Sequence, residues 1–246
     1  MTSAAADLAV IVFAYNEREN LAPVLMELLA YLDRHGPAAE VIVVDDGSSD
    51  GSAEVAEQVL AGRRAQVVRH GQNRGIGAAL KSGVAACSAP WVTFLPADGQ
   101  IEPQAIGTLR GALDTPRVGA VLSVYADRDD GWRRTFLSWG IRSLITLLLG
   151  VRVDSDGPYL FRRELFEEQR LKPDTFFLNF EFPIRLARLR VPLRTVTIRC
   201  RPRRAGHSKS ANLGRIVAVA QDLLALRLRL WTERPVAALS DQPGAR

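Results

Sequence analysis

Two adjacent acids in the first quarter of the chain, Asp45 and Asp46, are its most informative side chains. They follow the apolar run 41–44 and precede the turn-forming sequence GSSDG at 47–51. Neighbouring carboxylates repel each other, so they need a partner such as a ribose hydroxyl, a base amide or a cation. We therefore predict that Asp45 and Asp46 bind a ligand. Asp50 and the serines of the turn are expected to cap the next helix instead.

A second polar turn follows another apolar run and has the sequence PADGQ at 96–100. The carboxylate of Asp98 and the amide oxygen of Gln100 can face one hard cation, such as Mg²⁺ or Mn²⁺, and such an ion can bridge a diphosphate. The alternative is a polar turn that caps the helix expected near Glu102. These residues alone leave both readings open.

Two further segments have features of a phosphate site. The sequence NRGIG at 73–77 opens an expected helix, where glycines permit a close backbone approach and the positive helix end attracts anions. It lacks the lysine and hydroxyl spacing of a P-loop, so a tight turn before a packed helix is the alternative. The basic loop 200–211, with Arg204 and Lys209, either clamps a phosphate or is simply solvated.

The segments around these residues alternate between strand and helix patterns. Short apolar runs predict strands at 8–13, 41–44, 65–68, 91–95 and 118–124, and helical spacing predicts helices at 20–34, 52–61, 76–87 and 102–113. This alternation predicts an α/β fold, with a mostly parallel sheet and helices on both faces. The polar turns follow strands, so we expect them to meet at the carboxyl edge of the sheet, where such folds bind ligands.

The second half has a different pattern. It predicts amphipathic helices within 133–149, a helix at 176–190, a strand at 193–199 and a long helix at 213–231. We accordingly divide the chain into an α/β domain at 1–212 and a C-terminal amphipathic helix with its tail at 213–246.

Charge is unevenly distributed along the chain. Residues 1–123 contain 9 basic and 14 acidic residues, a net charge of −5, whereas residues 124–246 have a net charge of +10. Because arginine suits phosphate and carboxylate groups, the second half points to a phosphate-rich partner or an anionic membrane face. A nucleic-acid partner is set aside, since the basic residues are not interleaved with aromatic ones and the acidic half would repel a phosphate backbone.

Composition narrows the class of protein. The 246 residues are 47% apolar and 24% charged, which is an ordinary globular balance. Two cysteines exclude a disulfide framework. Neither a secretory signal nor an apolar stretch of spanning length is visible, so we expect a cytoplasmic protein that is soluble or peripheral to a membrane.

Together these segments resemble one family. The sequences FAYNE at 13–17, VVDDGSSDG at 43–51, NRGIG at 73–77 and ADGQIEP at 97–103 are similar to the nucleotide-sugar-binding half of inverting family 2 glycosyltransferases with the GT-A (Rossmann-like) fold. DSDGPYLFRR at 154–163, NFE at 179–181 and RAGHSK at 204–209 resemble the dolichol-phosphate mannose synthase-like branch, which transfers a sugar to a polyprenyl phosphate. The resemblance extends over residues 8–212.

The resemblance implies roles for individual residues. The nucleotide-sugar would be bound by Ala14, Tyr15, Glu17, Asp45, Asp46, Arg74, Ala97, Asp98 and Gln100. Of these, Asp98 and Gln100 would ligate Mg²⁺ or Mn²⁺. Glu181 would orient the transferred sugar, and Arg204 and Lys209 would approach the diphosphate, which makes the implied catalytic set Asp98, Glu181, Arg204 and Lys209. The acceptor phosphate would be held by Arg133 or Arg134 together with Ser138.

Two departures from the family pattern bear on the chemistry. Pro96 stands where the metal motif usually begins with an acid, which leaves the dependence on a metal open. The proline that usually precedes Ala14 is Phe13, and this difference is expected to affect packing only. The QxxRW motif of processive polysaccharide synthases does not occur, which argues against a polymerase.

The reaction that the resemblance implies is direct displacement at the anomeric carbon with inversion. A phosphate acceptor is largely ionised at neutral pH and needs positive charge rather than a strong base. Apolar faces at 136–149 and 213–231 with flanking arginines are typical of interfacial helices, and the alternative for each is a helix of the core or of a dimer contact. We thus expect peripheral attachment to the inner face of the membrane, alone or with a membrane-protein partner.

Two other functions compete with this interpretation. One is a glycosyltransferase that acts on a saccharide or small-molecule hydroxyl, for which Glu181 or Asp156 would be the base. The other is a non-catalytic nucleotide-sugar-binding module, suggested by Pro96. The sequence does not distinguish GDP-mannose from UDP-glucose as the donor.

Overall fold

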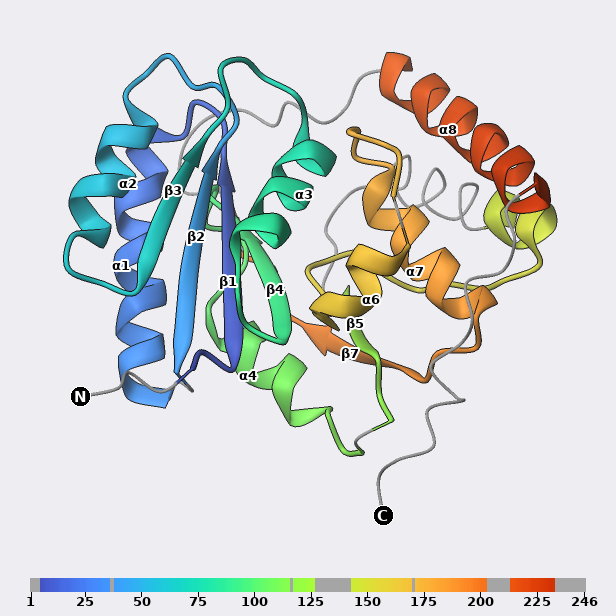
Figure 1. Cartoon of the computed structure of the whole chain (residues 1–246), viewed down its shortest axis with the longest axis horizontal. Coiled ribbons are helices and arrows are strands. Elements are labelled where there is room, and N and C mark those ends of the chain that lie inside the picture. Colours follow the sequence, from blue (N-terminus) through green and yellow to red (C-terminus); the bar gives the residue numbers. More distant parts are fainter. Residues whose placement is uncertain are drawn as a thin grey trace.

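The computed structural model describes residues 5–35, 38–115, 117–126, 143–169, 171–202 and 213–232. These residues form a seven-stranded sheet with the spatial order β3-β2-β1-β4-β6-β5-β7 (Figure 1). The strands are β1 (Leu8–Ala14), β2 (Ala39–Asp45), β3 (Ala65–Arg69), β4 (Trp91–Pro96), β5 (Ala120–Tyr125), β6 (Leu160–Arg162) and β7 (Leu193–Ile198). The pairs β1–β2, β1–β4, β2–β3 and β5–β7 are parallel, and only β6 runs antiparallel to its neighbours. The predicted mostly parallel sheet is confirmed.

Helices cover both faces of the sheet, as predicted (Figure 1). They are α1 (Arg18–His35), α2 (Ser52–Leu60), α3 (Ile76–Ala86), α4 (Gln104–Gly111), α6 (Arg163–Glu168), α7 (Leu178–Arg188) and α8 (Leu213–Thr232), and residues 143–149 are also helical. Side chains of β1 alternate between two apolar cores because successive residues of a strand face opposite sides. Val10 and Val12 pack in the core with α1, α2 and α4, whereas Ile11 packs in the core with α3, α6, α7 and α8.

The register of the central strands places the polar turns together. Ala14 pairs with Asp45, and Phe13 pairs with Pro96, so β1, β2 and β4 end side by side. This confirms the expectation that the turns after these strands share the carboxyl edge of the sheet.

Two elements were not predicted. β6 has three residues and α6 has six, both too short for a periodic pattern to stand out. Of the amphipathic region predicted at 133–149, residues 143–149 are helical and 133–142 lie outside the described residues. The domain boundary at 212 stays a prediction. Among the described helices, none is both long and apolar enough to cross a membrane.

Candidate active site

The turns after β1 and β2 are locked to each other by hydrogen bonds. The backbone N–H of Asn16 donates to Ser48 Oγ at 2.9 Å, and the N–H of Ser49 donates to Asn16 Oδ1 at 2.9 Å. The N–H of Glu17 donates to Ser52 Oγ at 3.0 Å. The predicted donor-binding segment 14–17 is thus held rigidly beside residues 45–52, with Tyr15 partly exposed to solvent at the edge.

Asp50 has the structural role that the sequence favoured. Its carboxylate accepts hydrogen bonds from the N–H groups of Arg18 and Ser52, the first residues of α1 and α2, at 3.0 Å each. The N-cap position of α2 is Gly51, so Asp50 acts from one residue earlier than a standard cap. Burial opposes ionisation, but the hydrogen bonds from Ser52 and Arg18 outweigh it and lower the pKa of Asp50 below its ordinary value.

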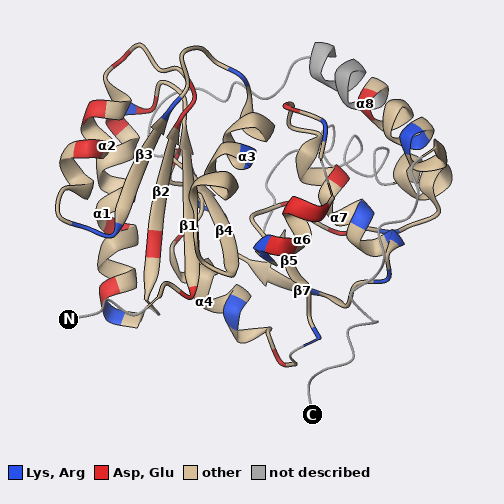
Figure 2. Ribbon diagram, viewed as in Figure 1, with Lys and Arg blue, Asp and Glu red and all other residues tan. Residues whose placement is uncertain are grey.

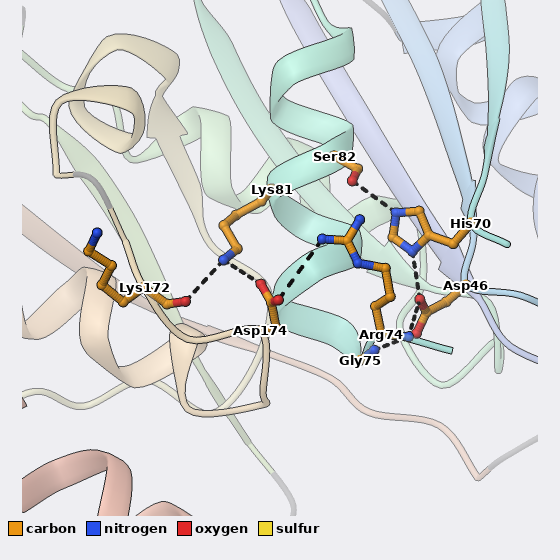
Figure 3. Close-up of polar contacts among 8 residues, drawn as sticks. All are labelled: Asp46, His70, Arg74, Gly75, Lys81, Ser82, Lys172 and Asp174. Carbon is orange, nitrogen blue, oxygen red and sulfur yellow. Dashed lines mark hydrogen bonds and ion pairs between the residues drawn. The ribbon is translucent and has the colours of Figure 1, made fainter. Parts of the chain in front are cut away.

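Asp46 is buried and bound to three internal donors (Figure 3). Its carboxylate lies 2.7 Å from His70 Nδ1, and it accepts the N–H groups of Arg74 at 2.9 Å and Gly75 at 2.8 Å. The other ring nitrogen of His70 lies 2.9 Å from Ser82 Oγ on α3. Asp46 therefore fixes the start of α3 to the end of β2, a role that the sequence analysis did not foresee.

Asp45 is also buried, but only one of its two carboxylate oxygens accepts a hydrogen bond. Oδ2 accepts the N–H of Ser48 at 3.2 Å, whereas Oδ1 has no hydrogen-bond partner among the described residues. Buried polar atoms of native proteins are nearly always paired, so an unpaired oxygen indicates a partner that is absent. The binding of a ligand by one or both of these acids stays a prediction. The unpaired Oδ1 makes Asp45 the better candidate.

The glycines at the start of α3 accommodate the protein's own backbone. A Cβ atom on Gly77 would lie 2.5 Å from the carbonyl oxygen of Thr175, and one on Gly75 would lie 2.8 Å from that of Asp174. The Ala78 N–H donates to the Asp174 carbonyl at 3.2 Å. The alternative reading of this motif, a tight turn before a packed helix, therefore describes what the structure shows, and the close approach is made by segment 174–175.

The turn at 97–100 has a sparse set of metal ligands. Asp98 Oδ1 accepts the N–H of Gln100 at 3.1 Å, and the Gln100 side-chain nitrogen donates to the Arg201 carbonyl at 3.4 Å. The described residues contain no cluster of three or more His, Cys, Asp or Glu side chains that could enclose a metal. One carboxylate and one amide oxygen fit Mg²⁺ or Mn²⁺ when diphosphate oxygens and waters complete the coordination.

Arg201 anchors the beginning of the basic loop to this turn. Its N–H donates to the Gln100 carbonyl at 2.8 Å, and its guanidinium pairs with Glu27 at 2.6 Å and Glu102 at 3.0 Å. Arg201 therefore positions the chain beside Asp98. The predicted clamp residues Arg204 and Lys209, and the predicted acceptor-phosphate residues Arg133, Arg134 and Ser138, lie outside the described residues.

Glu181 is fully buried in the first turn of α7. Its two carboxylate oxygens accept hydrogen bonds from Arg185 Nε at 2.9 Å and from an Arg229 nitrogen of α8 at 2.8 Å. Both oxygens therefore bind guanidinium groups. Its role in orienting the sugar stays a prediction.

Comparison with known proteins identifies the class and then the family. The fold is that of GT-A glycosyltransferases. Mannosyl-3-phosphoglycerate synthase from Rubrobacter xylanophilus has a TM-score of 0.73 over 97% of this chain and 79% of its own, at 22% identity. Glucosyl-3-phosphoglycerate synthase from Mycobacterium tuberculosis, crystallised with Mn²⁺, UDP and glucosyl-3-phosphoglycerate, has a TM-score of 0.70 over 92% of this chain and 80% of its own, at 23% identity. Residues 9–170 match the family model "Glycosyl transferase family 2", and the chain belongs to that family.

Two relatives with names that refer to lipid phosphates match at higher identity, whereas the succinoglycan biosynthesis protein ExoU of Rhizobium meliloti, 39% identical over 44% of this chain and 31% of its own, has no such name. Undecaprenyl-phosphate 4-deoxy-4-formamido-L-arabinose transferase of Edwardsiella ictaluri is 32% identical over 152 residues, which are 61% of this chain and 46% of the relative. Polyprenol monophosphomannose synthase of Mycolicibacterium smegmatis is 30% identical over 175 residues, 65% of this chain and 63% of the relative. The match thus spans less than two thirds of either relative.

Proposed function

We propose that the protein transfers a sugar from a nucleoside-diphosphate sugar to a polyprenyl phosphate, with inversion at the anomeric carbon. The observation that carries the proposal is the meeting of the three polar turns at one sheet edge, with a buried, unpaired oxygen on Asp45 and a carboxylate on Asp98. The names of the relatives supply the substrate classes, since both refer to polyprenyl or undecaprenyl phosphates.

The proposed donor site uses groups from each turn. Asp45 would accept a hydrogen bond from the base or ribose, and Ala14, Tyr15 and Glu17 would line the same pocket. Asp98 and Gln100 would hold Mg²⁺ or Mn²⁺, which supplies positive charge to the leaving diphosphate when bound. Arg204 and Lys209 would add charge from the basic loop, a preorganised stabilisation of the leaving group.

The proposed reaction is a single displacement. An oxygen of the acceptor phosphate forms a bond to the anomeric carbon while the bond from that carbon to the nucleoside diphosphate breaks, and the diphosphate leaves with the electron pair. The acceptor oxygen is already ionised at neutral pH, so no base is required. The engagement of both Glu181 oxygens by arginines argues against Glu181 as the base that a hydroxyl acceptor would need, which leaves Asp156 for that role.

A panel of transfer assays tests the proposal. Labelled UDP- and GDP-sugars are offered with polyprenyl phosphate or with saccharide acceptors, each with Mn²⁺ or with EDTA. We expect product on the lipid phosphate only, and loss of transfer in Asp98→Ala. Transfer to a hydroxyl acceptor alone would favour the competing glycosyltransferase. Tight nucleotide binding without any transfer would favour a non-catalytic module.

We further propose that the enzyme works at the cytoplasmic face of a membrane and docks through the outer side of α8. Leu224, Leu228 and Trp231 are exposed and recur at helical spacing, while Leu223 and Leu226 pack into the core. Trp231 is 86% exposed, and tryptophan is a side chain that favours membrane interfaces.

The charges around this stripe suit an anionic surface. Between residues 221 and 232, α8 has an exposed arginine, Arg227, and a single acid, Asp222, while its other arginine, Arg229, is paired with the buried Glu181 (Figure 2). The helical segment 143–149 lies at the C-terminal end of α8 in Figure 1 and adds exposed Leu144 and Leu147. An amphipathic surface with exposed leucines, a tryptophan and an arginine is typical of interfacial docking.

Vesicle binding tests the docking surface with a matched control. Leu228 on α8 and Met26 on α1 are each 63% exposed. We expect Leu228→Asp to lose binding to vesicles that contain anionic lipid, whereas Met26→Asp keeps it. Transfer to a short, water-soluble polyprenyl phosphate should be equal in both variants. Equal vesicle binding by both variants would refute the docking surface and leave the proposed reaction untouched.

A further inference from the structure

Segment 171–176 makes an unexpected contact with α3 and with the loop 73–75 before it, where Arg74 is predicted to bind the donor. The carboxylate of Asp174 forms an ion pair with Lys81 on α3 and lies 4.0 Å from the guanidinium of Arg74 (Figure 3). Lys81 Nζ also donates to the Lys172 carbonyl at 3.2 Å. The Asp174 carbonyl accepts the N–H of Ala78 in the first turn of α3. One residue of the second half thus binds α3 through both its side chain and its backbone.

The same loop is held from its other side by Asp46. That carboxylate accepts the N–H groups of Arg74 and Gly75, and His70 and Ser82 continue the hydrogen-bonded chain to α3. Residues 74 and 75 are therefore fixed between a buried acid of the first half and Asp174 of the second. Figure 3 shows the two contacts on either side of the start of α3.

Segment 171–176 is itself firmly anchored. Leu171, its first residue, and Phe177, the residue after it, are buried in the core shared with α3 and α7. Thr175 Oγ1 donates to Asp222 of α8 at 2.7 Å and accepts the N–H of Phe177 at 3.2 Å. Asp174 is consequently presented to α3 from a fixed support.

We propose that Asp174 is a positioning residue that holds the loop 73–75, and the side chain of Arg74, in the conformation that binds the donor. The proposal rests on the proposed function for the identity of the ligand. Asp174 pairs more closely with Lys81 than with Arg74, so the guanidinium of Arg74 is left to pair with an anionic ligand. The sequence gives no hint of this role, because Asp174 lies far along the chain from the loop that it holds.

If Asp174 acted only through its negative charge, the change in nucleotide affinity in Asp174→Asn would have the opposite sign. If Asp174 only repelled the donor diphosphate, its neutralisation in Asp174→Asn would tighten nucleotide binding. If Asp174 positions the loop, the same variant weakens binding. The experiment is a calorimetric titration with UDP and GDP in the presence of Mg²⁺, on the full chain.

We expect Asp174→Asn to weaken the affinity for the bound nucleotide about three- to fivefold, as is usual for a partly exposed ion pair. Asp174→Glu should restore affinity to within about twofold, because it can still reach Lys81. In transfer assays the KM for the donor should rise with kcat nearly constant. The control is Asp114→Asn, since Asp114 pairs with Arg194 and is 52% exposed against 46% for Asp174.

Amide hydrogen exchange without nucleotide separates this proposal from the proposed function. Exchange in residues 73–78 should be faster in Asp174→Asn than in the wild type, with no change in α2. Unchanged exchange, unchanged affinity or tighter binding would each overturn the positioning role. If the wild type bound neither nucleotide, the proposed donor class would be wrong, and the exchange rates alone would decide whether Asp174 holds the loop.

Discussion

The buried ion cluster around Glu181 makes a quantitative prediction. Glu181 is 0% exposed, and its partners Arg185 and Arg229 are 6% and 24% exposed. Replacing Glu181 by Gln keeps its shape but leaves the Arg185 charge buried without a counter-charge. Removal of one member of a buried pair costs about 3–5 kcal/mol, so we expect the free energy of unfolding to fall by this amount.

Two further variants test the origin of that loss. Arg229→Met leaves Glu181 paired with Arg185, so we expect a smaller cost of about 1–3 kcal/mol, the range for a hydrogen bond to a charged group. The double variant Glu181→Gln, Arg185→Met removes both buried charges and should recover part of the stability of the single Gln variant.

Urea unfolding followed by circular dichroism measures these differences, and transfer activity is measured in parallel. The reasoning would be refuted if Glu181→Gln lowered the free energy of unfolding by less than about 1 kcal/mol while transfer was abolished. Loss of one member of a buried ion pair should cost more than this. That result would instead assign Glu181 to the sugar, as the family resemblance implies.

Three other predictions concern a helix cap, a buried thiol and a glycine of α3. Asp50→Ala should lower the free energy of unfolding by about 1–2 kcal/mol, because a helix cap is lost. The pKa of Asp50 is lowered in the folded state, so its contribution to the stability of the wild type, measured by urea unfolding, should decline as the pH falls below about 4. Burial raises the pKa of Cys87 to about 11, so in native protein at pH 8 iodoacetamide should label the more exposed Cys200 and spare Cys87, as mass spectrometry would show. Gly77→Ala should lower the thermal midpoint more than Gly111→Ala, because a Cβ at Gly77 meets the Thr175 carbonyl whereas one at Gly111 meets nothing.

Local patterns predicted the sheet edge because the physics involved is local. Apolar runs and helical spacing specify each βα unit, and parallel strands necessarily bring their carboxyl ends to one edge. This was enough to place Ala14, Asp45 and Ala97 together. It was not enough for β6, whose three residues are a strand only because β4 and β5 lie on either side of them.

Side-chain partners from distant segments could not be predicted in this way. Whether Asp45 or Asp46 remains available to a ligand depends on His70 and on the backbone of residues 74 and 75. One feature of the sequence pointed to His70: it directly follows a strand, as do the polar residues at the same edge of the sheet. Asp174 gave none, because its partners Arg74 and Lys81 are specified only by the packing of α3 against the second half.

The different surroundings of Asp45 and Asp46 lead to opposite phenotypes for the same substitution. Arg74 and Gly75 donate to different oxygens of Asp46, so Asp46→Asn would present an amide N–H₂ to one of these two N–H groups, and we expect about 2–3 kcal/mol lower stability. Asp45→Asn removes a buried, unpaired carboxylate oxygen, so stability should stay the same or rise.

Nucleotide binding completes the distinction between the two acids. If the donor gives a hydrogen bond to Asp45 Oδ1, an amide N–H₂ there cannot accept it, and the affinity should fall about tenfold or more. Urea unfolding and calorimetric titration with UDP and GDP on the two variants measure both quantities. A stable Asp45→Asn variant with wild-type affinity for the nucleotide would show that the unpaired oxygen has another purpose, and the donor site would have to be sought away from β2.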